Sequence, residues 1–81
     1  MRVHYALLDE ELVALFEACG IEYEDLDGVP CVLADDFQAY MTEIEDWLWT
    51  VEPEGEGTYW SKYDEIDYNY QFWSTEARKW L

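Results

Sequence analysis

The chain has few basic residues. Two arginines and two lysines stand against twenty aspartates and glutamates, which gives a formal net charge of −16 over 81 residues. Direct binding of DNA or RNA needs a basic face that neutralises phosphates, and so few cations cannot form one. The same charge repels anionic membrane surfaces. The composition therefore excludes a nucleic-acid or membrane-surface binder and predicts a basic protein partner.

Groups that carry out chemistry are also scarce. The only histidine, His4, lies near the N-terminus, so no Ser-His or Cys-His pair can be argued beyond that one candidate. Neighbouring carboxylates are uninformative in so acidic a chain, and no glycine-rich phosphate cradle is visible. We therefore expect a protein that is not an enzyme, with no catalytic residue, no cofactor and no metal site.

Cys19 and Cys31 form no CxxC motif, so their spacing does not indicate a zinc site. No apolar run approaches the length of a membrane span, and the first residues do not form a signal peptide. The predicted compartment is the cytoplasm, where thiols stay reduced and both cysteines would be free. A disulfide between them is the alternative if the compartment is oxidising.

The chain is rich in aromatic residues, with five Trp, seven Tyr and three Phe. Disordered acidic chains are usually poor in aromatics, so this content favours a folded protein. Its length corresponds to a single domain, which we expect to span residues 1–81.

The N-terminal part of the chain has clear helix boundaries. Residues 1–7 could form a first strand or an extended arm. Residues 10–19 are predicted to form a helix, because apolar residues recur at helical spacing between an N-cap at Asp9 and a C-terminal Gly20. A β-hairpin is predicted over residues 21–33, turning at Asp27-Gly28, and Pro30 suggests that its second strand lies at an edge.

A second helix follows, with Asp35 or Asp36 as its expected N-cap and its end near Thr50. Its apolar residues form the strongest periodic pattern in the chain, and they are Phe37, Tyr40, Met41, Ile44, Trp47 and Leu48. Residues 52–57, EPEGEG, are predicted to be an acidic loop. This loop could hold a hard cation loosely, but a solvated turn is the preferred interpretation.

The last part of the chain is ambiguous. Residues 66–72 alternate strictly between apolar and polar types, which predicts a strand with Ile66, Tyr68, Tyr70 and Phe72 facing the core. Its hairpin partner would begin at residues 59–60. A helix over 59–73 is the alternative. Ser74 or Thr75 would then cap a short final helix ending at residues 78–79.

These elements predict an α+β fold. We expect a small single domain in which two main helices pack on a short antiparallel sheet, with a short C-terminal helix.

Acidic and aromatic residues interleave on both sides of the loop, in TEIEDWLW (42–49) and YDEIDYNYQFW (63–73). Carboxylates accept bidentate arginine contacts much as phosphates do, and buried Trp or Tyr anchors supply affinity that charge alone lacks. The residues predicted to bind a partner are Glu43, Glu45, Asp46, Trp49, Glu52, Glu54, Glu56, Trp60, Asp64, Glu65 and Asp67. The alternative is that the acids are spread around the domain as solvated charge and that the two tryptophans belong to the core.

In length, charge and these two stretches, the chain resembles the small acidic inhibitors that phages and mobile elements make against host defence and DNA-processing enzymes. That class includes anti-CRISPR proteins, antirestriction proteins and phage uracil-DNA glycosylase inhibitors. The resemblance covers the whole chain in character only, because these proteins share no motif, and it assigns no residue a role. It implies DNA mimicry, in the host cytoplasm if the gene is a phage gene, that blocks a nucleic-acid-binding groove.

Two other interpretations stay open. Immunity proteins and antitoxins are also small and acidic, and they neutralise basic nuclease toxins. An acidic adaptor subunit of a larger assembly is the third, and its sign would be an aromatic patch too large for a monomer. A homodimer is compatible with all three.

Overall fold

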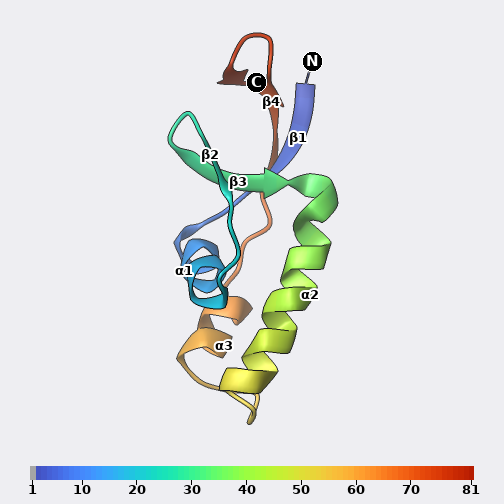
Figure 1. The fold of residues 1–81 in the computed structure, drawn as a ribbon. Coiled ribbons are helices and arrows are strands. Elements are labelled where there is room, and N and C mark those ends of the chain that lie inside the picture. The colour runs from blue at the N-terminus through green and yellow to red at the C-terminus, as the bar shows by residue number, and fades with distance from the viewer. Residues whose placement is uncertain (1) are drawn as a thin grey trace.

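The centre of the sheet is β1 (Arg2–Leu7), the first strand of the chain. In the computed structural model, which describes residues 2–81, β1 pairs with β3 (Val29–Leu33) on one side and with β4 (Tyr70–Ser74) on the other. The short strands β2 (Glu24–Leu26) and β5 (Lys79–Trp80) complete an antiparallel sheet of order β2-β3-β1-β4-β5. The sheet thus joins the two ends of the chain (Figure 1).

Helix α1 (Glu10–Cys19) has the predicted bounds and the predicted caps. The backbone N–H of Leu12 donates a hydrogen bond of 2.8 Å to Asp9 Oδ1, which satisfies a free donor of the first turn. Gly20 ends the helix in the left-handed conformation, with φ of 83°, where glycine has no Cβ clash.

The β2–β3 hairpin turns at Asp27 and Gly28, whose φ angles of 57° and 79° match the type I′ turn expected there. The first strand starts at Glu24, three residues later than predicted. The prediction of an edge position for Pro30 is wrong, because β3 lies inside the sheet. Pairing with β1 begins only at Leu7↔Cys31, so Pro30 lies just outside that ladder and its missing N–H interrupts nothing.

Helix α2 (Ala34–Val51) confirms the second predicted helix. Its N-cap is Leu33, which makes no side-chain capping bond, so the predicted caps at Asp35 or Asp36 are wrong. Both aspartates lie in the first turn instead, where their charge favours the positive end of the helix dipole. The predicted apolar face is buried or partly buried against the core, and its fully inward residues are Phe37, Met41, Ile44 and Leu48.

The prediction of a β-hairpin over residues 59–72 is wrong at its first half. Residues Thr58–Asp64 form the short helix α3, and the strand β4 begins only at Tyr70. Tertiary packing overrides the local pattern here, because Trp60 inserts from α3 into the core with 8% of its surface exposed. The prediction of a short helix ending at residues 78–79 is also wrong, because residues 75–78 form a turn. The short helix in this part of the chain is α3 instead.

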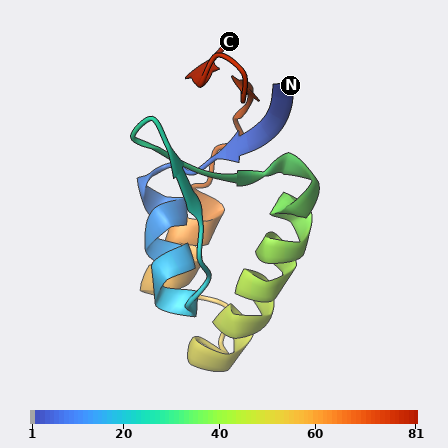
Figure 2. The same ribbon diagram turned by 45° about the horizontal axis from the view of Figure 1, so that its top comes forward.

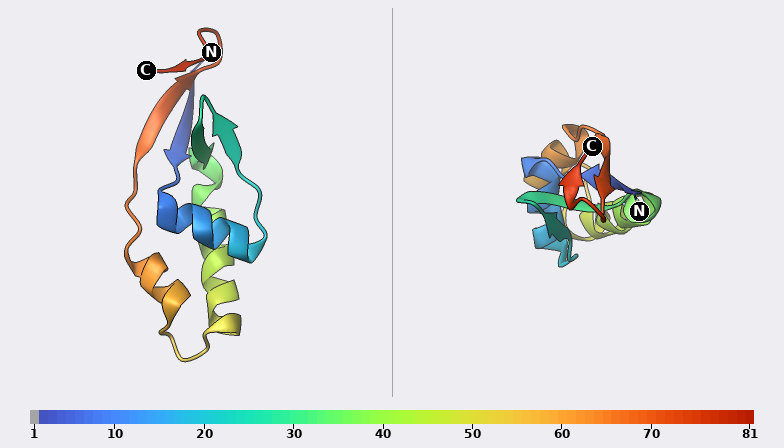
Figure 3. Two further views of the ribbon diagram at one scale, coloured as in Figure 1. Left: turned by 90° about the vertical axis from the view of Figure 1, so that its left-hand side faces the viewer. Right: turned by 90° about the horizontal axis from the view of Figure 1, so that it is seen from above.

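The predicted core side of residues 66–72 is also mostly wrong. Ile66 packs against the core, but Tyr68, Tyr70 and Phe72 are 63%, 43% and 42% exposed. The physical reason is that the helices do not extend along the whole length of the sheet. They cover the sheet only at one end, and the β1–β4 ribbon continues beyond them toward both chain termini (Figure 3).

Two apolar clusters hold the domain together. The larger lies between the three helices and one face of the sheet, and includes Leu12 and Phe16 of α1, Ile44 of α2 and Trp60 of α3. Figure 2 shows α1 and α2 extending from the same side of the sheet, with α3 partly behind α1. The smaller cluster joins Tyr5, Cys31, Trp73 and Trp80.

The described residues confirm the α+β class, with three helices and a five-stranded antiparallel sheet. The molecule is elongated, with extents of 46 × 19 × 18 Å. Cys19 and Cys31 are free thiols, as predicted. Among residues 2–81, none of the helices is long and apolar enough to cross a membrane.

Candidate functional site: an acidic body and a basic tip

Charge is distributed unevenly along the molecule. We define the tip as residues 2–5 and 70–81, which form the paired ends of β1 and β4 and the β5 turn, and the body as residues 6–69. The tip holds three of the four basic residues, Arg2, Arg78 and Lys79, and only one acid, Glu76. The body holds the other nineteen acids and Lys62, so its net charge is −18 and that of the tip is +2. The acidic surface is therefore the body.

The three predicted acids of α2 are all exposed, but they do not share one side. The charge of Glu43 acts on Cys19 of α1, where burial first and this charge second raise the pKa of the thiol. Glu45 lies on the α3 side, near the Tyr63 hydroxyl. Burial, followed by the charge of Glu45, raises the pKa of that hydroxyl. Carboxylates therefore line both flanks of the helix.

Glu52 has a structural role. One of its side-chain oxygens, Oε1, accepts hydrogen bonds from the backbone N–H groups of Tyr59 at 3.0 Å and Trp60 at 2.9 Å. These donors belong to the first turn of α3, whose N-cap Gly57 provides no side-chain bond. A carboxylate there also favours the positive end of the helix dipole. Glu52 thus caps α3 from the end of α2, and it is only partly exposed.

Glu54 and Glu56 lie in the loop at the end of the molecule opposite the tip, and both are exposed. The loop joins α2 to α3 in a tight reversal, visible at the bottom of Figure 1. Gly55, with φ of 80°, lies against the Trp49 ring, which a Cβ at that position would meet at 3.2 Å. The structure thus places two exposed carboxylates on either side of the glycine that lies against the Trp49 ring.

The two predicted anchor residues differ in exposure. Trp49 is 50% exposed and packs against Trp60, with ring centroids 4.8 Å apart. Trp60 is buried, and its Nε1–H donates to the backbone oxygen of Glu52 at 2.8 Å. Trp60 therefore belongs to the core, whereas about half of the Trp49 surface faces solvent.

The remaining predicted acids extend around α3. Asp64 lies near Tyr63 and contributes to its raised pKa, which brings it to the same side as Glu45. Asp67 lies elsewhere, because its backbone N–H donates to Asp9 Oδ2 at the start of α1. Glu65 is exposed at the C-cap of α3. The predicted set thus surrounds the body instead of covering one face.

The structure shows two grooves in the acidic body that the sequence did not indicate. The α1 groove, of about 560 Å³, is lined by Leu8, Asp9, Glu10, Val13, Ala14, Glu17 and Pro30. The hairpin groove, of about 250 Å³, is lined by Glu22, Tyr23, Glu24, Val32, Leu33, Asp36 and Tyr40. Both combine an apolar floor with carboxylates. The acidic residues at 22–27 indicate where one of these grooves is charged, but they do not show which apolar residues the fold places beside them.

The tip carries exposed rings instead of acids. The His4 ring contacts the Tyr70 ring at 5.3 Å and the Phe72 ring at 4.7 Å, both in tilted geometry, and the Arg2 guanidinium lies over the Phe72 ring at 4.8 Å. Phe37 of α2 contacts Tyr70 edge-on at 5.9 Å and so joins this ladder to the body. The ladder explains why these rings tolerate solvent, since each is covered partly by its neighbours.

Cys31 is a buried thiol close to acidic side chains. Burial raises the pKa of Cys31 to about 11, and the charge of Glu24 contributes to this. A thiol with such a pKa is a poor nucleophile at neutral pH. Among residues 2–81, no group of three or more His, Cys, Asp or Glu side chains is arranged to hold a metal ion.

Comparisons with protein-family models, with curated proteins and with solved structures find no match for this chain.

Proposed function

We propose that the protein is an inhibitor that mimics nucleic-acid charge and blocks the DNA- or RNA-binding groove of a host defence or DNA-processing protein. The intended partner is a basic protein, and the inhibitor acts in the cytoplasm. It does so without catalysis, by occupying the groove with its acidic body.

The observation that carries this proposal is the charge per unit length. All charged side chains lie within the described residues, and 46 Å divided by a net charge of 16 is about 2.9 Å per charge. A DNA duplex carries one charge per about 1.7 Å of axis, and a single strand one per about 3.4 Å. An elongated molecule of this charge density can release the counterions of a basic groove as a nucleic acid does.

Charge alone would give a weak and promiscuous ligand, so the proposal also needs apolar contacts. The body offers them in three places, at the half-exposed Trp49 and in the two grooves. Each lies beside carboxylates. A basic groove that places an apolar residue between its cations would therefore distinguish this body from an ordinary polyanion.

The test is competition. Protein captured from a host lysate by the tagged chain is identified, and its affinity for a labelled DNA or RNA duplex is measured with increasing inhibitor at several salt concentrations. We expect displacement of the duplex and an affinity that falls steeply with salt. A captured partner that binds duplex and inhibitor at once, or binds with no salt dependence, would overturn the proposal. Capture of a single nuclease toxin would instead support an immunity protein.

Matched charge reversals locate the contact. Glu54→Lys with Glu56→Lys and Glu22→Lys with Asp25→Lys both change the net charge from −16 to −12 at exposed positions. We expect the loop pair to weaken partner binding more than the hairpin pair, with little effect of either on folding. Equal losses would place the contact outside the loop, and no loss in either variant would contradict charge mimicry.

A second candidate is an acidic subunit of a larger assembly, and the exposed rings of the tip and of the adjoining Tyr68 favour it. Tyr68, Tyr70 and Phe72 are exposed large apolar residues within a continuous ladder. Exposed aromatic patches commonly mark protein interfaces. Substitution of Phe72 by serine would abolish assembly under this candidate and would leave inhibition intact under the first.

A further inference from the structure

The α1 groove combines an apolar floor with two carboxylates at a regular spacing. Glu10, Val13, Ala14 and Glu17 occur at positions i, i+3, i+4 and i+7 of α1, so they lie along one face of the helix. At a rise of about 1.5 Å per residue, the two glutamates are about 10.5 Å apart along the helix axis. The face therefore presents an acid, two small apolar residues and a second acid in succession.

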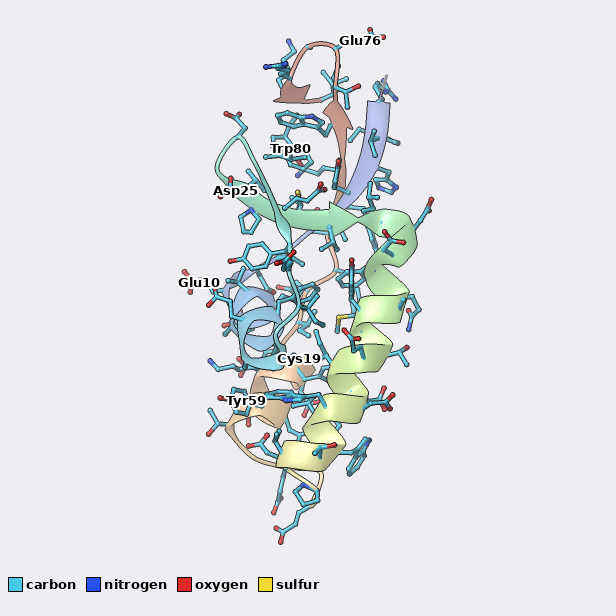
Figure 4. All side chains as sticks on the ribbon, viewed as in Figure 1. Glu10, Cys19, Asp25, Tyr59, Glu76 and Trp80 are labelled. Atoms are coloured by element: carbon cyan, nitrogen blue, oxygen red, sulfur yellow. The ribbon has the colours of Figure 1, made fainter. Side chains whose placement is uncertain are left out.

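Neighbouring elements complete the groove. Leu8, which follows β1, and Pro30 of β3 line it together with Val13 and Ala14. The groove of about 560 Å³ thus has apolar walls from α1, from the residue that follows β1 and from the hairpin. Glu10 projects on the side of the molecule away from α2, where Asp25 of the hairpin also lies (Figure 4). A molecule approaching this side meets negative charge before it meets the apolar floor.

The carboxylates that line the groove differ in the hydrogen bonds that they already accept. Asp9 also lines the groove, but its carboxylate already accepts the backbone N–H groups of Leu12 and Asp67. Glu17 accepts the Tyr23 hydroxyl at 2.9 Å, which fixes its side chain and leaves further lone pairs available. A carboxylate that is already held in place loses less conformational entropy when it binds a ligand, so the entropic cost of the contact is smaller.

We propose that the α1 groove binds an amphipathic basic helix of the partner, which places an apolar side chain over Val13 and Ala14. Arginine or lysine side chains one turn to either side of that residue pair with Glu10 and Glu17. Charge complementarity selects this occupant, because a purely apolar helix would leave both carboxylates without a cation, and a purely basic segment would leave the apolar floor in water. The inference rests on the proposed function, since it supplies the apolar anchor that charge mimicry needs.

The experiment uses a synthetic helical peptide with a central leucine and an arginine one turn to each side. Its binding to the full chain is mapped by amide chemical shifts. Two comparison peptides replace the leucine by serine or both arginines by glutamine. We expect shifts centred on Val13 and Ala14, and at least a tenfold loss of affinity with either comparison peptide. Shifts centred on α2 or the 52–57 loop, or equal binding of the serine peptide, would overturn the inference.

Variants of the protein provide the matched control. Glu10→Gln with Glu17→Gln removes two charges at the groove, and Asp27→Asn with Asp35→Asn removes two from exposed positions outside the groove and outside the predicted partner-binding set. We expect a tenfold or greater loss of peptide affinity in the first pair and less than a twofold loss in the second. Ala14→Gln fills the groove floor with a residue that α-helices accept, and it should weaken binding at unchanged net charge. Equal losses in the two pairs would contradict the inference.

The two proposals fail separately. If the peptide maps to the α1 groove but the protein never displaces a nucleic acid from its partner, the groove inference is supported and charge mimicry is contradicted. If the protein displaces nucleic acid and Ala14→Gln does so equally well, charge mimicry stands and the groove falls.

Discussion

The position of α3 should depend on a single carboxylate. Glu52 is the C-cap residue of α2. Its side-chain Oε1 nevertheless accepts hydrogen bonds from two backbone N–H groups of α3, those of Tyr59 and Trp60. The N-cap residue of that helix, Gly57, contributes no side-chain bond. Glu52→Ala therefore leaves two donors of the first turn without their protein acceptor, in a helix of 7 residues that cannot persist by propensity alone.

The expected cost follows from these bonds. A hydrogen bond to a charged group contributes about 1.5–3 kcal/mol, and loss of a helix cap costs about 0.5–2 kcal/mol. Because Glu52 is partly exposed and water can replace it, we expect a loss near the cap value, about 2 kcal/mol. For a domain of this size, each kcal/mol shifts Tm by about 4–8 °C, so Tm should fall by about 8–16 °C. Glu52→Gln keeps an acceptor oxygen and should lose less.

Glu54→Ala is the matched control, because it removes the same charge from the same loop at an exposed position. It should change stability by less than about 0.5 kcal/mol. Thermal unfolding by circular dichroism gives the comparison, and amide hydrogen exchange gives a local one, since Tyr59 and Trp60 should lose protection in Glu52→Ala. Equal Tm values for the two variants, or unchanged exchange at both amides, would refute a capping role.

Four further predictions concern charge and titration. Added salt should raise Tm, because a net charge of −16 repels itself, and a Tm insensitive to salt would mean that the charges are already compensated. In the native protein, a thiol reagent should modify the partly exposed Cys19 first and the buried Cys31 only on unfolding, and simultaneous modification would contradict this placement. The pKa of Cys31 is about 11 in the folded state against 9.0 for a free thiol, so the unfolded chain loses its proton first and stability should fall as pH rises from 9 to about 11. Cys31→Ala should make the fall of Tm over that pH interval less steep, which pH-dependent melting would show. Glu45→Gln should lower the pKa of Tyr63, measured by ultraviolet titration, because the charge of Glu45 helps to raise it, and an unchanged value would separate the two residues.

The N-terminal part of the fold could be read from the sequence because its signals are local. Asp9 and Gly20 mark the ends of α1 within the chain itself, and the Asp27-Gly28 turn fixes the hairpin. The apolar spacing of α2 extends over several turns, so no competing period matches it.

The C-terminal part could not be read in this way because its stabilising contacts are remote. Helix α3 begins without a capping residue of its own and depends on Glu52, which local patterns assign to a loop. The alternation of residues 66–72 predicts a half-buried strand, but the pattern does not show that the helices stop short of the sheet's far end. Tyr70 and Phe72 therefore face outward beside His4.

The candidate site shows the same division. Exposure of Glu54 and Glu56 beside Trp49 follows from the composition of the loop. The α1 groove could not be predicted, because Leu8, Pro30 and Val13 meet only through the pairing of β1 with β3. The spacing of Glu10 and Glu17 is visible in the sequence. Apolar residues at positions 13 and 14, however, would ordinarily be interpreted as part of a helix surface that binds no ligand.

The separation of a positive tip from a negative body gives the molecule a permanent electric moment along its long axis. Near a positively charged surface, such a moment experiences a torque as well as an attraction, so the molecule turns before it touches. The body is then presented first, and the aromatic ladder is held outward, where it remains available while the body is bound. Orientation would thus precede contact, and it would weaken with salt over the same range as the attraction itself.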